Sequence, residues 1–236
     1  MSSLLDPDQQ RQIFHEKAAL PKGQGWDDLW KEGVTPWIRD RPSPAIEDLV
    51  RSAKVTLPTG RYLVPGCGIG RDVYFYASLP QSTEVWGVDI SSTAMEQANR
   101  ELASHRLQDK GSDQANLDKI HFKTMDLFSE DSQSIQPFDL IYDYTFLCAL
   151  PPTMRPRWAE RITQLTKPDG LLIALAFPLS DHLGGPPPPP SMSIYHELLD
   201  PHFTLIHPPP PAKSLEGREG KERLTVCPPP VSSSPN

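Results

Sequence analysis

The chain has 236 residues, a length that fits one α/β domain with short extra segments. Its net charge of -7 disfavours nucleic acid as the main partner, because phosphate binding requires a basic surface. Three scattered cysteines form neither a disulfide framework nor a zinc pattern, and no apolar run has the length of a membrane span or the layout of a signal peptide. We therefore expect a cytoplasmic protein without a bound metal and without a membrane partner.

Residues 1–44 are predicted to form a separate helical segment that carries three of the five tryptophans. Trp26 and Trp30 are four residues apart and share a helical face, and Trp37 follows in a loop. One interpretation is an aromatic plug on the core. The other is a lid over a cationic ligand, since aromatic faces attract a positive charge and exclude water.

The stretch from Arg61 to Asp72 is typical of a buried strand, a glycine turn and the start of a helix. Its glycines form G-x-G-x-G from Gly66 to Gly70, which differs from the G-x-G-x-x-G of dinucleotide-binding folds. The next predicted strand, about residues 84–89, ends in Asp89, whose carboxylate can accept hydrogen bonds from both hydroxyls of a ribose. The pattern suits S-adenosylmethionine, a nucleoside with an amino-acid tail and no phosphate. A glycine turn without a ligand is the alternative.

Strands and helices alternate over the rest of the chain. Strands are expected over residues 120–128, 138–145, 171–177, 203–206 and 222–226, helices over 72–78, 91–102, 155–165 and 195–199, and a polar surface loop over 104–118. This alternation predicts a doubly wound, mostly parallel α/β sheet with helices on both faces, a Rossmann-like fold. We place the main domain at residues 45–226 and a polar, proline- and serine-rich tail at 227–236.

Several polar residues follow predicted strands. They are Asp89, Asp126, the pair Asp143-Tyr144, and Asp181-His182. Ligands of doubly wound sheets bind across the carboxyl ends of the strands, near the point where the strand order reverses. The sequence therefore predicts a functional cleft at this edge.

A set of motifs, taken in chain order, carries a family resemblance. They are Trp26-x-x-x-Trp30, Gly33-x-Thr35-Pro36-Trp37, Leu63-Val64-Pro65-Gly66-Cys67-Gly68, Asp89-Ile90-Ser91, Asp126-Leu127-Phe128, Lys167-Pro168-Asp169-Gly170 and Asp181-His182-x-Gly184-Gly185-Pro186-Pro187. With them the chain resembles the thiol and halide methyltransferases of plants and fungi, within the thiopurine S-methyltransferase-like group. The resemblance implies a seven-stranded, class I S-adenosylmethionine-dependent methyltransferase whose N-terminal segment closes over the cofactor.

The resemblance also implies a role for each matching residue. It assigns Trp26, Trp30 and Trp37 to the aromatic lid, Gly66 to the methionine moiety, Asp89 to the ribose, Asp126 and Leu127 to the adenine, and Tyr144 to the region of the reacting centre. After Leu224 the chain departs from the group, because Cys227 and three prolines replace a tryptophan-containing strand. The last strand is therefore predicted to be short.

The chemistry predicted for the acceptor is an in-line displacement on carbon. A thiol with a pKa near ~8.5 is already a few per cent thiolate at neutral pH, so a general base is weak or absent. Candidates for assisting a thiol are Asp143, Asp181 and His182. We expect a monomer that methylates a small thiol, bisulfide, thiocyanate or a halide. The alternatives are O- or N-methylation of another small molecule, and a cofactor-binding pseudoenzyme.

Overall fold

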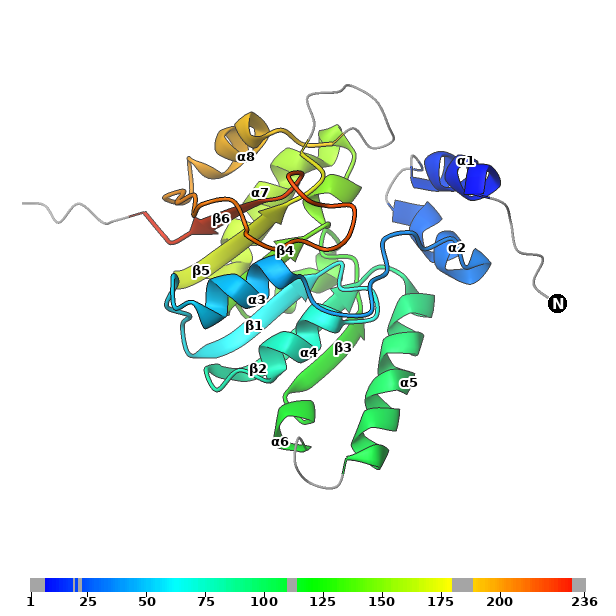
Figure 1. The fold of residues 1–236 in the computed structure, drawn as a ribbon, viewed down its shortest axis with the longest axis horizontal. Helices are drawn as coiled ribbons and strands as arrows, with labels where there is room; N and C mark the ends of the chain where they lie inside the picture. The colour runs from blue at the N-terminus through cyan, green and yellow to red at the C-terminus, as the bar shows by residue number, and fades with distance from the viewer. Residues whose placement is uncertain (1–6, 19, 21–22, 110–113, 180–188, 231–236) are drawn as a thin grey trace, which may run out of the picture.

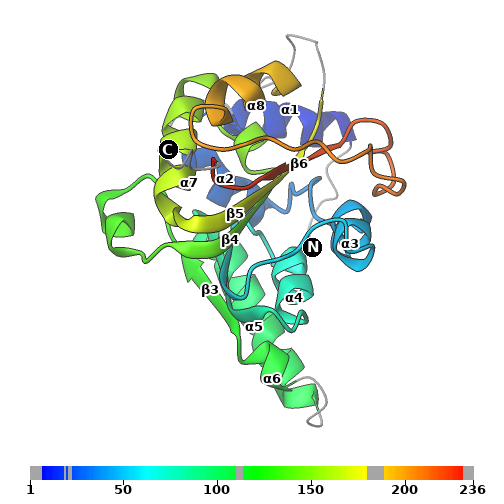
Figure 2. The same ribbon diagram turned by 90° about the vertical axis from the view of Figure 1, so that its left-hand side faces the viewer.

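A computed structural model describes residues 7–18, 20, 23–109, 114–179 and 189–230. A six-stranded sheet lies between two layers of helices (Figure 1). Helices α1 (Pro7–Ala18) and α2 (Gln24–Glu32) lie apart from these layers, beside the ends of the strands. Turning the molecule by a quarter shows α7 and α3 on opposite sides of the sheet (Figure 2).

The sheet has the predicted doubly wound topology. Its strand order is β3-β2-β1-β4-β5-β6, and only β6 is antiparallel to its neighbour. The order reverses between β1 and β4, which makes this the expected place for a ligand. The strands are β1 Gly60–Pro65, β2 Ser82–Asp89, β3 Ile120–Thr124, β4 Phe138–Tyr144, β5 Thr166–Ala176 and β6 Arg223–Cys227.

The prediction of seven strands is wrong by one. The expected edge strand at residues 203–206 is reduced to a single bridge between Ile206 and Val226. These two residues exchange backbone hydrogen bonds of 2.9 and 2.8 Å. Four prolines follow from Pro208 to Pro211 and have no N–H to donate, so the ladder stops after one residue pair.

The remaining helices fill the positions between the strands. They are α3 Pro44–Arg51, α4 Arg71–Ala77, α5 Ser92–Gln108, α6 Gln114–Leu117, α7 Arg155–Leu165 and α8 Met192–Leu199, with short 3₁₀ turns at Glu130–Ser134, Leu147–Ala149 and Pro152–Met154. The loop predicted over 104–118 is wrong in part, because α5 continues to Gln108 and α6 follows. Its residues from Ser104 to Gln108 include good helix formers, which extend a helix that Ser91 already caps.

Both faces of the central strands are buried, as the apolar run in β5 predicts. Leu171, Ile173 and Leu175 point into the core under α3 and α4, whereas Leu172 and Ala174 point into the core under α7 and α8. Alternate side chains of β5 thus pack into the cores on the two faces of the sheet. Among the described helices, none is both long and apolar enough to cross a membrane.

Candidate active site

A cavity of about 760 Å³ lies at the carboxyl ends of the strands. The ends of β1, β2, β3, β4 and β5 each contribute to its wall, through Gly66, Asp89, Asp126, Thr145 and Phe177. The opposite wall comes from α1, α2 and the loop that follows α2. The structure therefore brings the predicted strand-end residues and the N-terminal aromatic segment to one site.

The glycine turn has no room for side chains, because aromatic rings pack against its backbone. Gly66 has a φ of 61°, and a Cβ built there would lie 2.7 Å from the Phe146 ring. Gly68 has a φ of 52°, and a Cβ there would lie 3.2 Å from the indole of Trp30. Both positions favour glycine by conformation and by space. The second contact also shows that Trp30 covers the turn directly.

Asp89 ends β2 inside the cavity wall. Its Oδ2 accepts a hydrogen bond from the Gly68 N–H at 3.0 Å, and its Oδ1 accepts from the Ser91 N–H at 2.9 Å. Burial raises the pKa of Asp89, while these backbone donors favour the carboxylate. Each oxygen keeps a further lone pair, so the group has the capacity to accept from two ribose hydroxyls.

The pair Asp126-Leu127 lies beside Asp89, in the turn after β3. Asp126 Oδ1 accepts from the Phe128 N–H at 2.8 Å, which orients the carboxylate, and both residues of the pair line the cavity. Phe128 and Phe146 add nearly parallel rings with centroids 6.1 Å apart. Two acids and flat apolar surfaces thus occupy the half of the cavity above β1, β2 and β3.

The aromatic segment forms one cluster over this half. The rings of Trp26 and Trp37 have centroids 5.2 Å apart, Trp30 lies 6.0 Å from Trp37, and all three line the cavity. Phe14 of α1 joins them at 5.9 Å from Trp37. Phe14 was not predicted as part of the lid, because a single phenylalanine on a polar helix has no spacing pattern that would indicate it.

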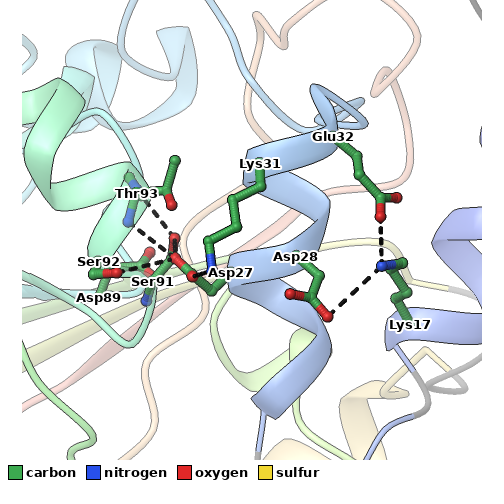
Figure 3. Close-up of polar contacts among 10 residues, drawn as sticks. Lys17, Asp27, Asp28, Lys31, Glu32, Asp89, Ser91, Ser92 and Thr93 are labelled. Atoms are coloured by element: carbon green, nitrogen blue, oxygen red, sulfur yellow. Dashed lines mark hydrogen bonds and ion pairs between the residues drawn. The ribbon is translucent and has the colours of Figure 1, made fainter.

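Asp27 attaches this aromatic segment to the sheet domain (Figure 3). Its Oδ1 accepts from the Ser91 hydroxyl at 2.7 Å and from the Thr93 N–H at 2.9 Å, at the N-terminus of α5. Although burial opposes it, the Lys31 ammonium at 2.7 Å and these donors hold the pKa of Asp27 well below its usual range. Because Ser91 also donates to Asp89, one residue contacts both the predicted ribose acid and the lid.

Lys17 joins α1 to α2. Its ammonium lies 2.7 Å from Glu32 and 3.7 Å from Asp28 (Figure 3). Helix α1 is thus tied to α2, and α2 to α5. Sequence reasoning missed both Asp27 and Lys17, because isolated charges on a polar helix are indistinguishable from a solvated face.

The other half of the cavity, above β4 and β5, contains a buried arginine. Arg218 comes from the loop before β6, is 3% exposed and lines the wall. Its guanidinium lies 4.3 Å from the centre of the Phe177 ring and donates to the Tyr144 hydroxyl, which donates to Glu222 Oε1 at 2.5 Å. Arg39 lines the same cavity, and its burial together with the charge of Arg218 lowers its pKa. This half is therefore cationic and aromatic.

Two predicted residues do not line the cavity. The Tyr144 side chain belongs to the core under α3 and α4, because strand alternation turns it to the same side as Tyr142, and the neighbouring Thr145 reaches the cavity instead. Asp143 is buried among three donors, the Trp158 indole at 2.8 Å and the N–H groups of Phe146 and Leu147. This burial raises the pKa of Asp143 to about 6. Their proposed roles stay predictions.

The remaining catalytic candidates, Asp181 and His182, lie outside the described residues. The cysteines near the site are poor nucleophiles. Burial raises the pKa of Cys148, which lines the cavity, to about 12, and raises that of Cys67 well above its usual value. A thiol that stays protonated does not attack a methyl group, so the arrangement favours direct transfer to a bound acceptor.

Solved structures of known proteins share this architecture. Over 94% of this chain and 98% of theirs, the N-methyltransferase NodS of Bradyrhizobium japonicum in complex with S-adenosylhomocysteine superimposes with a TM-score of 0.58 at 14% identity. The magnesium protoporphyrin IX methyltransferase of Synechocystis with bound S-adenosylmethionine gives 0.57 at 16% identity, over 98% of this chain and 100% of that one. The fold is that of a class I S-adenosylmethionine-dependent methyltransferase, as predicted.

Sequence comparison defines the family. The model of the family described as thiopurine S-methyltransferase (TPMT) matches residues 22–207. A probable thiol methyltransferase 2 of Arabidopsis thaliana is 39% identical over 91% of this chain and 88% of its own length. Thiocyanate methyltransferase 1 of Brassica oleracea is 41% identical over 85% and 82%. The chain belongs to the thiopurine S-methyltransferase family, which confirms the predicted family and cofactor.

The residues present fit that cofactor. Asp89 offers spare lone pairs at the end of β2, Gly66 presents bare backbone to the cavity, and the rings of Phe14, Trp26, Trp30 and Trp37 line the wall with faces that attract a positive charge. S-adenosylmethionine carries a ribose, an adenine and a positive sulfur, and each finds a group of suitable chemistry in the cavity.

Proposed function

We propose that this protein transfers the methyl group of S-adenosylmethionine to a small thiol, with bisulfide, thiocyanate or iodide as further acceptors. The observation that carries the proposal is that Asp89 and Asp126 line the half of the cavity over β1–β3, whereas the buried Arg218 lines the half over β4 and β5. The first half suits the adenosine, and the second suits an anion. The names of the Arabidopsis and Brassica relatives, which refer to a thiol and to thiocyanate, support a sulfur acceptor.

For the cofactor half, we propose that Asp89 holds the ribose, Asp126 and Leu127 bracket the adenine, and Gly66 lies against the methionine moiety. Residues 1–44 form the lid, with Trp26, Trp30, Trp37 and Phe14 covering the sulfonium and excluding water. Residues 45–226 form the catalytic domain. When bound, S-adenosylmethionine supplies a methyl group activated by its positive sulfur; the chain's own contribution is to orient it and keep it dry.

For the acceptor half, the proposal assigns Arg218 and Arg39 to attracting an anion. A positive charge beside a thiol favours its thiolate, which is the reactive form. A bound thiolate, thiocyanate or iodide then needs no general base. Asp143 fits the role of a positioning residue, because its three donors hold the turn after β4 that carries Thr145 and Phe146 to the cavity.

The test combines calorimetry with a panel of acceptors. We expect saturable binding of S-adenosylhomocysteine and methyl transfer to benzenethiol, bisulfide, thiocyanate or iodide, measured by mass spectrometry and gas chromatography. A phenol and an amine of matched size serve as controls. Transfer only to the phenol or the amine would contradict the thiol assignment. Cofactor binding without transfer to any acceptor would identify a pseudoenzyme instead.

A further inference from the structure

Two histidines face each other on the surface, outside the cavity. His196 lies on α8, and His207 follows the residue that bridges to β6, at the edge of the sheet where α8 lies (Figure 1). Their Nε2 atoms are 3.0 Å apart and their ring centroids 5.0 Å apart. The two rings therefore meet nitrogen to nitrogen.

The outer nitrogen of each ring also has a partner. His196 Nδ1 lies 3.2 Å from both carboxylate oxygens of Asp200, and His207 Nδ1 lies 3.2 Å from the Thr225 hydroxyl. Because a carboxylate only accepts, His196 Nδ1 carries the proton, and the neutral ring turns the lone pair of Nε2 toward His207. The Thr225 hydroxyl can donate or accept. When it accepts, His207 Nδ1 carries the proton, and His207 Nε2 also presents a lone pair, 3.0 Å from His196 Nε2.

We propose that the Nε2 atoms of His196 and His207 together bind a divalent transition-metal ion that prefers imidazole, such as Ni²⁺, Cu²⁺ or Zn²⁺, with water completing its coordination. Two nitrogens bound to one such ion at ~2.0–2.1 Å, with an angle of roughly 90–110° between them, stand roughly 2.9–3.4 Å apart. The observed 3.0 Å lies in this range. Asp200 stands behind His196 as carboxylates commonly stand behind metal-binding histidines.

The surrounding charges are compatible with this assignment. Burial, His196 and Arg223 lower the pKa of His207. Arg223 repels a cation, whereas Asp200 attracts one. Within the described part of the chain, no three His, Cys, Asp or Glu side chains are grouped to hold a metal ion, so this site has two protein ligands and is exposed. Without a metal, a proton on either Nε2 lets that nitrogen donate a hydrogen bond to the other.

A bound ion would fasten α8 to the edge of the sheet. Helix α8 and the segment that pairs with β6 are separated by the chain from Asp200 to Ile206, and the His196–His207 contact joins their ends. An ion that binds the folded chain and not the unfolded one raises its melting temperature. The site is separate from the methyl-transfer cavity, so the two proposals succeed or fail independently.

The test is isothermal titration calorimetry of the full chain with NiCl₂ and with ZnCl₂ at pH 7.5, in a buffer that does not bind metals. We expect saturable binding of one ion and a melting temperature that rises with metal concentration. His196→Gln and His207→Gln are each expected to weaken binding about tenfold or more, and Asp200→Asn by about tenfold. His202→Gln, a change of the same kind in the same region, should bind as the wild type does.

Two outcomes would overturn the proposal. One is the absence of saturable binding to the folded wild-type chain, which would leave the histidine pair as a contact held by a shared proton. The other is equal binding by the wild type and by His207→Gln, which would place the ion elsewhere. Cooperative thermal unfolding of each variant shows that it is folded, so that a loss of binding reports on the site.

Discussion

The polar side chains in the two halves of the cavity are held by different kinds of contact. Above β1–β3, Asp89 and Asp126 accept from backbone N–H groups of the turns that follow β1, β2 and β3, at 2.8–3.0 Å. Above β4 and β5, Arg218 is held by Tyr144 and Phe177, which lie 74 and 41 residues earlier in the chain. The first half is built from local turns and the second from side chains far apart in sequence. A binding site for an invariant nucleoside can rest on backbone geometry, whereas an acceptor site can change with single loop residues.

The largest effect is expected for Asp89, in the half of the cavity above β1–β3. Asp89→Asn removes the charge that would accept from the ribose, and two charge-assisted hydrogen bonds are worth about 3 kcal/mol together, a loss of roughly a hundredfold in affinity for S-adenosylhomocysteine. Calorimetry measures it, and Glu96→Gln, an exposed acid on α5, is the control. An unchanged affinity would contradict the proposal that Asp89 binds the ribose of the cofactor.

A second pair of variants compares two buried acids outside the cavity wall, Asp72 of α4 and Asp143 of β4. Burial raises the pKa of Asp72 and that of Asp143 to about 6, above the unfolded value of ~3.9. Between these pH values the native chain holds more protons than the unfolded chain, so the free energy of unfolding falls as pH rises from ~4 to ~6, by about 3 kcal/mol per group. Urea denaturation at several pH values measures this slope.

Asparagine at the two positions should behave differently. Asp72 accepts from the Ser43 N–H at 3.3 Å, a contact that an amide oxygen can replace, so Asp72→Asn is expected to lose its share of the slope and stay folded. Asp143 accepts on both oxygens, and an amide nitrogen would face a donor, so Asp143→Asn should lose about 2 kcal/mol at pH 7. Equal stability of the two variants at pH 7 would contradict this difference.

The lid is tested by removing one ring. Trp30→Ala takes away the indole that covers Gly68 and is expected to weaken S-adenosylhomocysteine binding by about 2 kcal/mol, roughly thirtyfold, through lost apolar contact and cation–π attraction. Trp86→Ala is the matched control, because Trp86 is a partly buried tryptophan outside the cavity wall. Similar losses in both variants would return Trp30 to a role in general packing.

A substitution of Arg218 tests the half of the cavity above β4 and β5, whose contacts join residues far apart in the sequence. Arg218→Met keeps an unbranched, flexible side chain and removes its charge. It is expected to lower kcat/KM for thiocyanate and benzenethiol about tenfold, or ~1.4 kcal/mol, while affinity for S-adenosylhomocysteine changes less than about twofold. Because Glu222 would lose a positive neighbour, Arg218→Met/Glu222→Gln serves as the control for folding. A change confined to the affinity for S-adenosylhomocysteine would contradict the assignment of Arg218 to the acceptor and would indicate a role in cofactor binding.

The smallest expected effect concerns the attachment of the lid. Asp27→Asn removes the charge that accepts from Ser91 and Thr93 and pairs with Lys31, and should weaken S-adenosylhomocysteine binding about fivefold, or ~1 kcal/mol. Asp28→Asn changes the neighbouring acid, which faces Lys17 instead. Calorimetry and limited proteolysis of the N-terminal segment compare the two. Equal behaviour would show that contact with α5 does not hold the lid.

The sequence by itself determined the parts that depend on neighbouring residues. The spacing of Gly66, Gly68 and Gly70, the acid at the end of β2 and the period of two in β5 are local patterns, and each predicted its structure correctly. The shared helical face of Trp26 and Trp30 was also readable from their spacing of four residues. These patterns can be recognised in the sequence because the residues are close along the chain, and the geometry of a helix, strand or turn fixes their relative positions.

Only the tertiary structure decided which distant side chains meet. It placed Asp27 on the N-terminus of α5, brought Phe14 to the tryptophans, and directed Arg218 into the cavity. It also turned Tyr144 into a core and reduced the seventh strand to one bridge. These residues carry no periodic or spaced pattern, and their partners lie dozens of residues away. Their contacts depend on how loops and helices pack around the sheet, which no local pattern specifies.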